Sequence, residues 1–110
     1  MPAIITREVL KRRLDAGEDV VVVDVLSPES YRAHHLPGAI NLPVSVIASD
    51  AVRDLPRDKV VVVYCASFAC QASPTAARKL EVLGFTQVLD FGGGLQDWVD
   101  AGYPLERSAE

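Results

Sequence analysis

Cysteines, aromatic residues and long apolar runs are all scarce in this chain of 110 residues. Its only cysteines are Cys65 and Cys70, whereas a secreted domain held together by disulfides would carry more of them, spread along the chain. No stretch approaches the roughly 20 apolar residues of a membrane helix, and residues 1–13 lack the apolar run of a signal peptide. These absences predict a cytoplasmic protein with no membrane partner.

Basic residues are in deficit, because 15 aspartates and glutamates outnumber 11 lysines and arginines and give a formal net charge of −4. Nucleic acids and anionic membranes bind basic surfaces, so neither is expected as a partner. A metal site is not expected either, since the two histidines, His34 and His35, are adjacent and far from both cysteines in the sequence. The glycines at 92–94 lack the spacing of a phosphate-binding loop and predict a tight turn.

Apolar residues make up 49% of the chain, enough for one core, and the length predicts a single domain over residues 1–110. Two runs of four valines, at 20–23 and 60–63, are typical of strands buried on both faces. Further strands are predicted at 3–5 and 87–91. Helical patterns start after Thr6 as N-cap and recur at 28–34, 44–49, 73–83 and 95–101. This alternation predicts an α/β fold with a parallel sheet covered by helices on both faces.

The candidate site follows the second valine strand, because ligand sites of open α/β sheets form at the carboxyl ends of the strands. Cys65 lies at that end, and Ser73 and Pro74 are suited to the N-cap and first position of the next helix. Between them runs a loop of mostly small residues. We call residues 65–73 the cysteine loop; after Cys65 it comprises Ala66, Ser67, Phe68, Ala69, Cys70, Gln71, Ala72 and Ser73.

A cysteine facing a helix N-terminus is favoured as a thiolate, because unpaired N–H groups and the helix dipole stabilise negative charge there. The small side chains would allow the loop amides to converge on the Cys65 sulfur and on an incoming anion. The alternative is a structural Cys65, buried as a small apolar residue at the end of its strand. Residue types and spacing alone leave both readings open.

Three motifs resemble those of the rhodanese family and occur in the order in which the family has them. They are DV at 24–25 with ESY at 29–31 and HLPGAINLP at 35–43, VVYC at 62–65, and GG at 93–94 with Trp98 and AGYP at 101–104. The resemblance implies a rhodanese-like fold with a five-stranded parallel sheet flanked by helices on both faces. It also implies a sulfurtransferase that needs no cofactor. Cys65 would take sulfane sulfur from thiosulfate or a persulfide, and pass it as a Cys65 persulfide to a thiol or cyanide.

The cysteine loop departs from the family pattern in its charge. Ala66 stands where the family often has arginine, Leu26 replaces the arginine that commonly follows Asp24-Val25, and no lysine or arginine follows Cys65 before Arg78. A doubly charged anion would lack a guanidinium partner, so weak activity with thiosulfate is expected. Related phosphatases have an arginine six residues after the cysteine. Gln71 stands there, and it cannot neutralise a phosphoryl transition state.

Several residues around Cys65 have two interpretations each. Cys70 is either a resolving thiol that forms a disulfide with Cys65 or a small residue filling the loop wall. Phe68 is either an exposed docking contact or, as we expect, packed on a neighbour. Asp24 and His35 are predicted to support the site, with Asp24 bracing nearby loops and His35 tying its turn to the sheet.

Three functions follow from these residues and the resemblance. The first is sulfur transfer through Cys65. The second is a non-catalytic or regulatory rhodanese-like module that binds a partner, with the cysteine loop as docking surface. The third is a thiol redox switch that uses Cys65 and Cys70.

Overall fold

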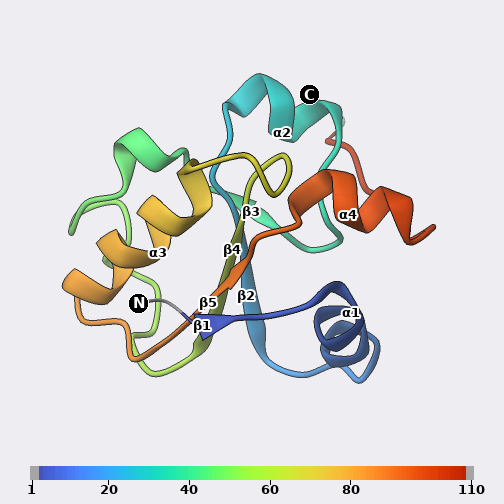
Figure 1. Cartoon of the computed structure of the whole chain (residues 1–110). Helices are drawn as coiled ribbons and strands as arrows, with labels where there is room; N and C mark the ends of the chain where they lie inside the picture. Colours follow the sequence, from blue (N-terminus) through green and yellow to red (C-terminus); the bar gives the residue numbers. More distant parts are fainter. Residues whose placement is uncertain (1–2, 109–110) are drawn as a thin grey trace.

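One parallel sheet with helices on both faces forms the computed structural model, which describes residues 3–108 (Figure 1). The strands are β1 (Ala3–Ile4), β2 (Val20–Asp24), β3 (Ile40–Asn41), β4 (Val60–Tyr64) and β5 (Gln87–Phe91), in the spatial order β1-β5-β4-β2-β3. The helices are α1 (Arg7–Asp15), α2 (Pro28–Ala33), α3 (Ala72–Val82) and α4 (Gly94–Asp100), with a 3₁₀ turn η1 (Val44–Val46). The predicted architecture is therefore confirmed.

The two valine runs form the centre of the sheet. Strand β4 lies between β2 and β5, and β2 pairs with β4 in register, Val20 opposite Val60 and Asp24 opposite Tyr64. Because parallel strands in this position are covered on both sides, a continuous β-branched run suits them better than an alternating pattern. The short strand β3 escaped prediction, since its two residues, Ile40 and Asn41, carry no periodic pattern.

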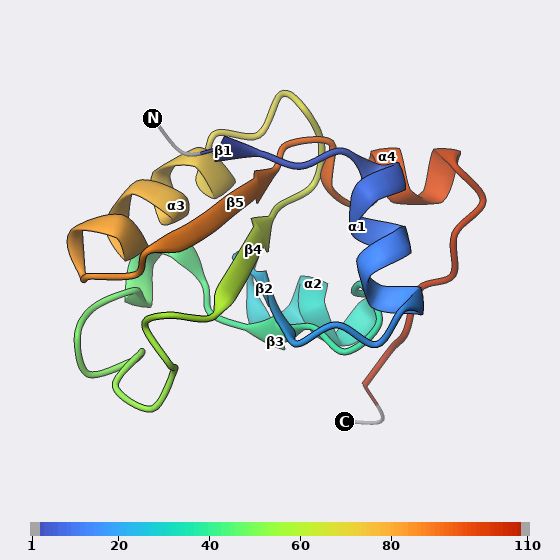
Figure 2. The same cartoon turned by 90° about the horizontal axis from the view of Figure 1, so that it is seen from below.

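Each face of the sheet has its own apolar core, and Figure 2 shows α3 on one side of the strands with α1 and α4 on the other. Helix α3 packs Ala77 and Leu80 against the side of β4 that carries Val61 and Val63. On the opposite side, Leu10, Leu95 and Trp98 of α1 and α4 pack with Val62, Tyr64 and Phe91. No helix among residues 3–108 is long and apolar enough to cross a membrane.

Two predicted helix boundaries are wrong. The helix expected at 44–49 is only the turn η1, because three of its first four residues are β-branched and lose side-chain freedom in a helix. Helix α3 begins at Ala72 with Gln71 in the N-cap position, so Ser73 is not the N-cap. The Gln71 carbonyl accepts the first bond of the helix, from the Thr75 N–H, and this places the N-cap two residues earlier than expected. Thr6 does cap α1, as predicted, by accepting from the Val9 N–H.

Ser73 instead points into the interior between α3 and β5. Its Oγ and Asp90 Oδ1 are both buried without a hydrogen-bond partner in the described part of the chain. Burial raises the pKa of the Asp90 carboxyl, and the nearby Ser73 hydroxyl opposes that shift. The apolar core between α3 and the sheet, which we call the α3 core, therefore also holds a carboxyl group whose charged form is poorly solvated.

We predict that Asp90→Asn stabilises the protein at neutral pH. A carboxyl whose pKa is higher in the folded than in the unfolded chain loses stabilising free energy as pH rises from the ordinary value of 3.8 through the raised value. The asparagine variant lacks this loss, so its advantage in unfolding free energy should shrink as pH falls toward 3.8. Urea unfolding at several pH values measures it, with the exposed Asp54→Asn as a charge-matched control. An effect of Asp90→Asn that does not change with pH would contradict the prediction.

Candidate functional site

Cys65 directly follows β4 and is completely buried. Its side chain belongs to the α3 core, together with Val25 and Val63. The residue therefore lies at the carboxyl end of a central strand, as predicted, and in surroundings that favour an uncharged sulfur. Any negative charge on this sulfur requires hydrogen-bond donors close by.

The first two residues of the cysteine loop are fastened to helix α4. The Leu95 N–H donates to the Cys65 carbonyl at 3.0 Å, and the Gln96 N–H donates to the Ala66 carbonyl at 2.9 Å. Gly94 makes this approach feasible, because it adopts a φ of 61° and a Cβ at this position would collide with the Cys65 carbonyl. The tight turn predicted from the glycines at 92–94 is therefore what holds the loop in place.

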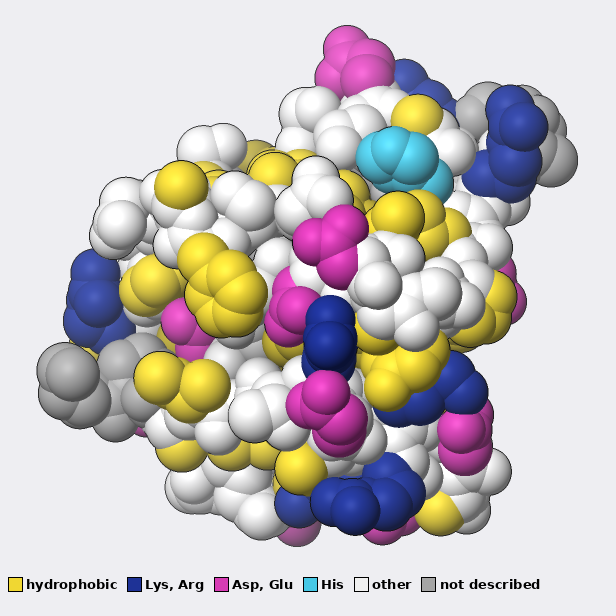
Figure 3. Space-filling view, turned by 45° about the vertical axis from the view of Figure 1, so that its right-hand side comes forward, with side chains coloured by type: hydrophobic (Ala, Val, Ile, Leu, Met, Phe, Trp, Pro, Cys, Tyr) yellow, Lys and Arg dark blue, Asp and Glu magenta, His cyan; other side chains and the backbone are white. Residues whose placement is uncertain are grey.

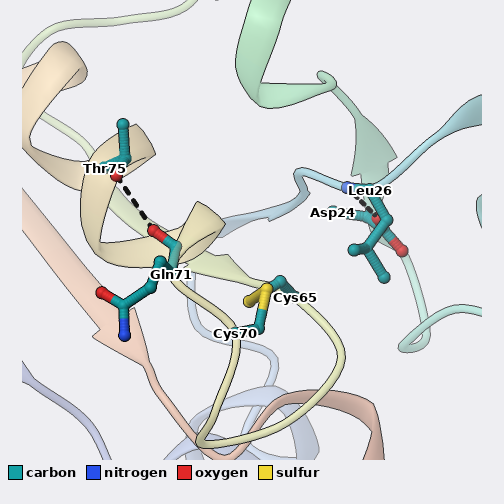
Figure 4. The surroundings of a disulfide bond; sticks show 6 residues. All are labelled: Asp24, Leu26, Cys65, Cys70, Gln71 and Thr75. Atoms are coloured by element: carbon teal, nitrogen blue, oxygen red, sulfur yellow. Dashed lines mark hydrogen bonds between the residues drawn. A yellow bond between two sulfur atoms is a disulfide. The ribbon is translucent and has the colours of Figure 1, made fainter.

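The cysteine loop turns back on itself so that Cys70 reaches Cys65. The Cys70 N–H donates to the Ser67 carbonyl at 3.1 Å, and the two sulfurs form a disulfide with the Cα atoms 6.4 Å apart. Figure 4 shows this bond between the end of β4 and the start of α3. Cys65 is inaccessible to solvent, whereas Cys70 is only partly buried.

The expected convergence of loop amides on the sulfur is not present in this disulfide form. Among residues 3–108, no N–H donates to the Cys65 sulfur. Nevertheless, the loop retains many unused donors, because the N–H groups of residues 66–69 and 71–73 donate to no acceptor in the described structure. The two that open α3 also carry the partial positive charge of a helix N-terminus.

Two loop side chains extend into solvent. Phe68 is 76% exposed, so the expectation that it packs on a neighbour is wrong. The small residues around it, and Gly92 opposite, offer too little surface to cover the ring. Gln71 is also exposed, and its carbonyl accepts from the Thr75 hydroxyl (Figure 4).

Asp24 is fully buried at the end of β2, where both of its carboxyl oxygens are in use. Oδ2 accepts from the Tyr64 hydroxyl at 2.7 Å and Oδ1 accepts from the Leu26 N–H at 2.9 Å. Burial raises the pKa of the Asp24 carboxyl, and these two donors oppose the shift. The Tyr64 hydroxyl also accepts from the Leu36 N–H at 3.0 Å, so one network joins β2, β4 and the segment after α2.

His35 is buried on the same side of the sheet as Tyr64. Its ring stacks on Tyr31, and its Nδ1 lies 2.7 Å from the Tyr31 carbonyl. Because a carbonyl can only accept, Nδ1 carries the proton. The His35 backbone pairs with Glu106 in both directions. His35 therefore joins α2 to the C-terminal segment and makes no contact with the cysteine loop through these bonds.

A surface hollow beside Ala66 could not be predicted from residue types and spacing. That hollow is lined by His34, Leu95, Gln96, Val99 and Leu105, and His34 is exposed although its neighbour His35 is buried. On the face shown in Figure 3, histidine side-chain surface lies near interspersed acidic and basic side chains. The adjacent histidines gave no hint of which one faces solvent. The pairing of loop carbonyls with α4 was also missed, although the glycine at 94 was its one signal.

We predict that Tyr64→Phe lowers the free energy of unfolding by about 1–3 kcal/mol, the cost of leaving buried hydrogen-bonding groups without a partner. The variant keeps the ring but removes the donor to Asp24 and the acceptor of the Leu36 N–H. Urea unfolding measures the loss. Tyr103→Phe is the matched control, because the Tyr103 hydroxyl makes no hydrogen bond within residues 3–108. Equal stability of the two variants would contradict this role for Tyr64.

Comparisons with known proteins give the family. A family model described as a rhodanese-like domain matches residues 6–101. A protein of Allochromatium vinosum named sulfurtransferase is 35% identical over 101 residues, which cover 92% of each chain. An HTH-type transcriptional regulator of Mycobacterium tuberculosis is 40% identical over 105 residues, but these cover 96% of this chain and only 45% of the regulator.

Solved structures agree with this result. The BH2092 protein of Bacillus halodurans superposes with a TM-score of 0.93 at 31% identity, over 96% of this chain and 77% of that one. The rhodanese-like domain of an Anabaena protein gives a TM-score of 0.85 at 30% identity, over 97% of this chain and 80% of that one. The family match, the sheet order and the motifs agree, and the chain belongs to the rhodanese-like domain family.

Proposed function

We propose that this chain is a sulfurtransferase that carries sulfane sulfur as a persulfide on Cys65. The observation that supports it most is the position of Cys65 at the end of β4, at the start of a loop whose amide N–H groups are mostly unused. The related protein of Allochromatium vinosum, matched over nearly its whole length, is named a sulfurtransferase. The chemistry requires reduced cysteines, which a cytoplasmic location would supply.

The burial of Cys65 belongs to the disulfide form. In the proposed reaction the disulfide is first reduced, the cysteine loop opens far enough to admit the donor, and the Cys65 thiolate attacks the outer sulfur of the donor. A new S–S bond forms on Cys65 while the donor's S–S bond breaks, and the rest of the donor leaves with the electron pair. An acceptor thiolate or cyanide then removes the outer sulfur and regenerates the Cys65 thiolate. Covalent catalysis of this kind divides the transfer into two easier displacements. The unused N–H groups of the loop are the donors available to the anionic sulfur.

The charge of the loop bears on the donor. The cysteine loop contains no lysine or arginine, and Leu26, at the position of the family's arginine, is partly buried against apolar neighbours. Thiosulfate would have to bind its two negative charges through amide dipoles alone, whereas a persulfide carries one charge. We therefore propose a low-molecular-weight or protein persulfide as the better donor.

A regulatory module that binds a protein partner is the second candidate. The relation to a transcriptional regulator and the exposure of Phe68 at the loop tip favour it. This function requires no reactive thiol, so the first experiment below decides between the two.

We predict that the reduced Cys70→Ser chain gains about 32 Da, the mass of one sulfur atom, on incubation with glutathione persulfide. Cys70 is replaced because it pairs with Cys65 in the structure and would compete for the product. The double variant Cys65→Ser/Cys70→Ser should gain nothing. Intact-mass spectrometry measures both. A Cys70→Ser chain that stays unmodified would reject sulfur transfer and leave the binding module.

We predict low catalytic efficiency with thiosulfate and cyanide, and its increase by Ala66→Arg in the Cys70→Ser background. A charge-assisted hydrogen bond contributes about 1.5–3 kcal/mol, so the gain in kcat/KM should be roughly tenfold or more. Val82→Arg, on the exposed surface of α3, adds the same charge elsewhere and serves as the control. High thiosulfate efficiency without the arginine, or equal gains from both arginines, would contradict the role given to loop charge.

A further inference from the structure

We propose that Cys70 is a second catalytic residue, which displaces the transferred sulfur from Cys65 as hydrosulfide and so makes this chain a persulfide reductase. The inference rests on the proposed persulfide at Cys65. It adds a product and a co-reactant that simple sulfur transfer does not have. Hydrosulfide leaves without an external acceptor, and a dithiol is then needed to restore the two cysteines.

The disulfide shows which sulfur Cys70 reaches. Its sulfur bonds directly to Sγ of Cys65, which is the inner sulfur of a Cys65 persulfide. Attack on that inner atom expels the outer sulfur, whereas attack on the outer atom would only move the persulfide to Cys70. The Cα atoms lie 6.4 Å apart, within the range that a disulfide spans, and the Ser67 turn brings the two residues together.

Burial and charge favour the same step. Cys65 is completely buried among Val25, Val63 and other apolar residues, and the cysteine loop has no basic side chain. An anionic persulfide in this position depends on amide donors alone, while a disulfide is neutral and fits an apolar site without them. The displacement thus moves the negative charge from a buried sulfur to a small anion that leaves for water.

Atoms and electrons balance as follows. The Cys70 sulfur, as a thiolate, forms the bond to Cys65 Sγ, and the bond from Sγ to the outer sulfur breaks. The outer sulfur leaves with that electron pair and takes up one proton, so hydrosulfide is formed. The sulfane sulfur is reduced by two electrons and the cysteine pair is oxidised by two.

A dithiol reductant restores the starting state. Cys70 is partly exposed and Cys65 is fully buried, so the reductant attacks the Cys70 sulfur and Cys65 leaves as a thiolate. The second thiol of the reductant then resolves the mixed disulfide on Cys70. The order of attack follows from access alone.

The test uses the full, reduced chain with one equivalent of glutathione persulfide, under anaerobic conditions and without added reductant. Hydrosulfide is trapped with a bimane reagent, and the protein is analysed by intact mass. The wild-type chain should release about one equivalent of hydrosulfide above a protein-free control and lose about 2 Da as both thiols disappear. Cys70→Ser and Cys70→Ala should release none and keep an adduct of about 32 Da on Cys65.

Four results would overturn the inference. A wild-type chain that keeps the adduct of about 32 Da and releases no hydrosulfide leaves sulfur transfer intact but removes the role of Cys70. A disulfide formed with peroxide but not with the persulfide assigns the pair to a redox switch. A Cys70→Ser chain that becomes glutathionylated shows that the hydrosulfide came directly from the donor. If Cys70→Ser gains no sulfur at all, the proposed function fails together with the inference.

Discussion

Complete burial of the Cys65 sulfur is the constraint on which the rest of the site depends. An atom at the end of β4, enclosed by the α3 core, is stable as a neutral group and costly as an anion. The structure meets this constraint with a disulfide to Cys70. When the disulfide is reduced, a negative charge on the Cys65 sulfur must be stabilised in another way. The unused N–H groups of the cysteine loop are the groups available for this.

Hydrogen bonds hold the framework around the site on both faces of the sheet. Tyr64 joins Asp24 and the Leu36 N–H beneath the carboxyl ends of β2 and β4, on the face opposite Cys65. On the loop itself, two carbonyls bind the first amides of α4. Residue 65 is thus held by contacts on both faces of the sheet.

Much of the fold could be predicted because its signals are local and repeated. The valine runs at 20–23 and 60–63 identify buried parallel strands, and their positions place Cys65 at a strand end. The resemblance of three motifs to those of the rhodanese family predicted how many strands the sheet contains. The two-residue strand β3 is too short to leave a pattern, and the starts of helices depend on one or two backbone angles. The residue type of Ser73 favours an N-cap, but Gln71 occupies the N-cap position of α3 with its backbone in a helical conformation.

The site was harder to predict than the fold, because it depends on contacts between distant segments. The pairing of the loop with α4 joins residues about thirty positions apart and shows only in the glycine at 94. Exposure of Phe68 follows from the absence of neighbours, which residue types do not reveal. By contrast, the spacing of Cys65 and Cys70 allowed a disulfide, and the structure contains one.

The hydrogen bonds between the cysteine loop and α4 also use up carbonyl groups of the loop and leave most of its N–H groups free. The carbonyls of Cys65, Ala66, Ser67 and Gln71 are occupied by N–H groups, while most of the amides between them are not. In the described structure the N–H groups of residues 66–69 and 71–73 are free, against the carbonyls of residues 68–70, so free donors outnumber free acceptors although the loop holds no lysine or arginine. Backbone N–H groups can bind an anion without adding net charge to a chain that is acidic overall.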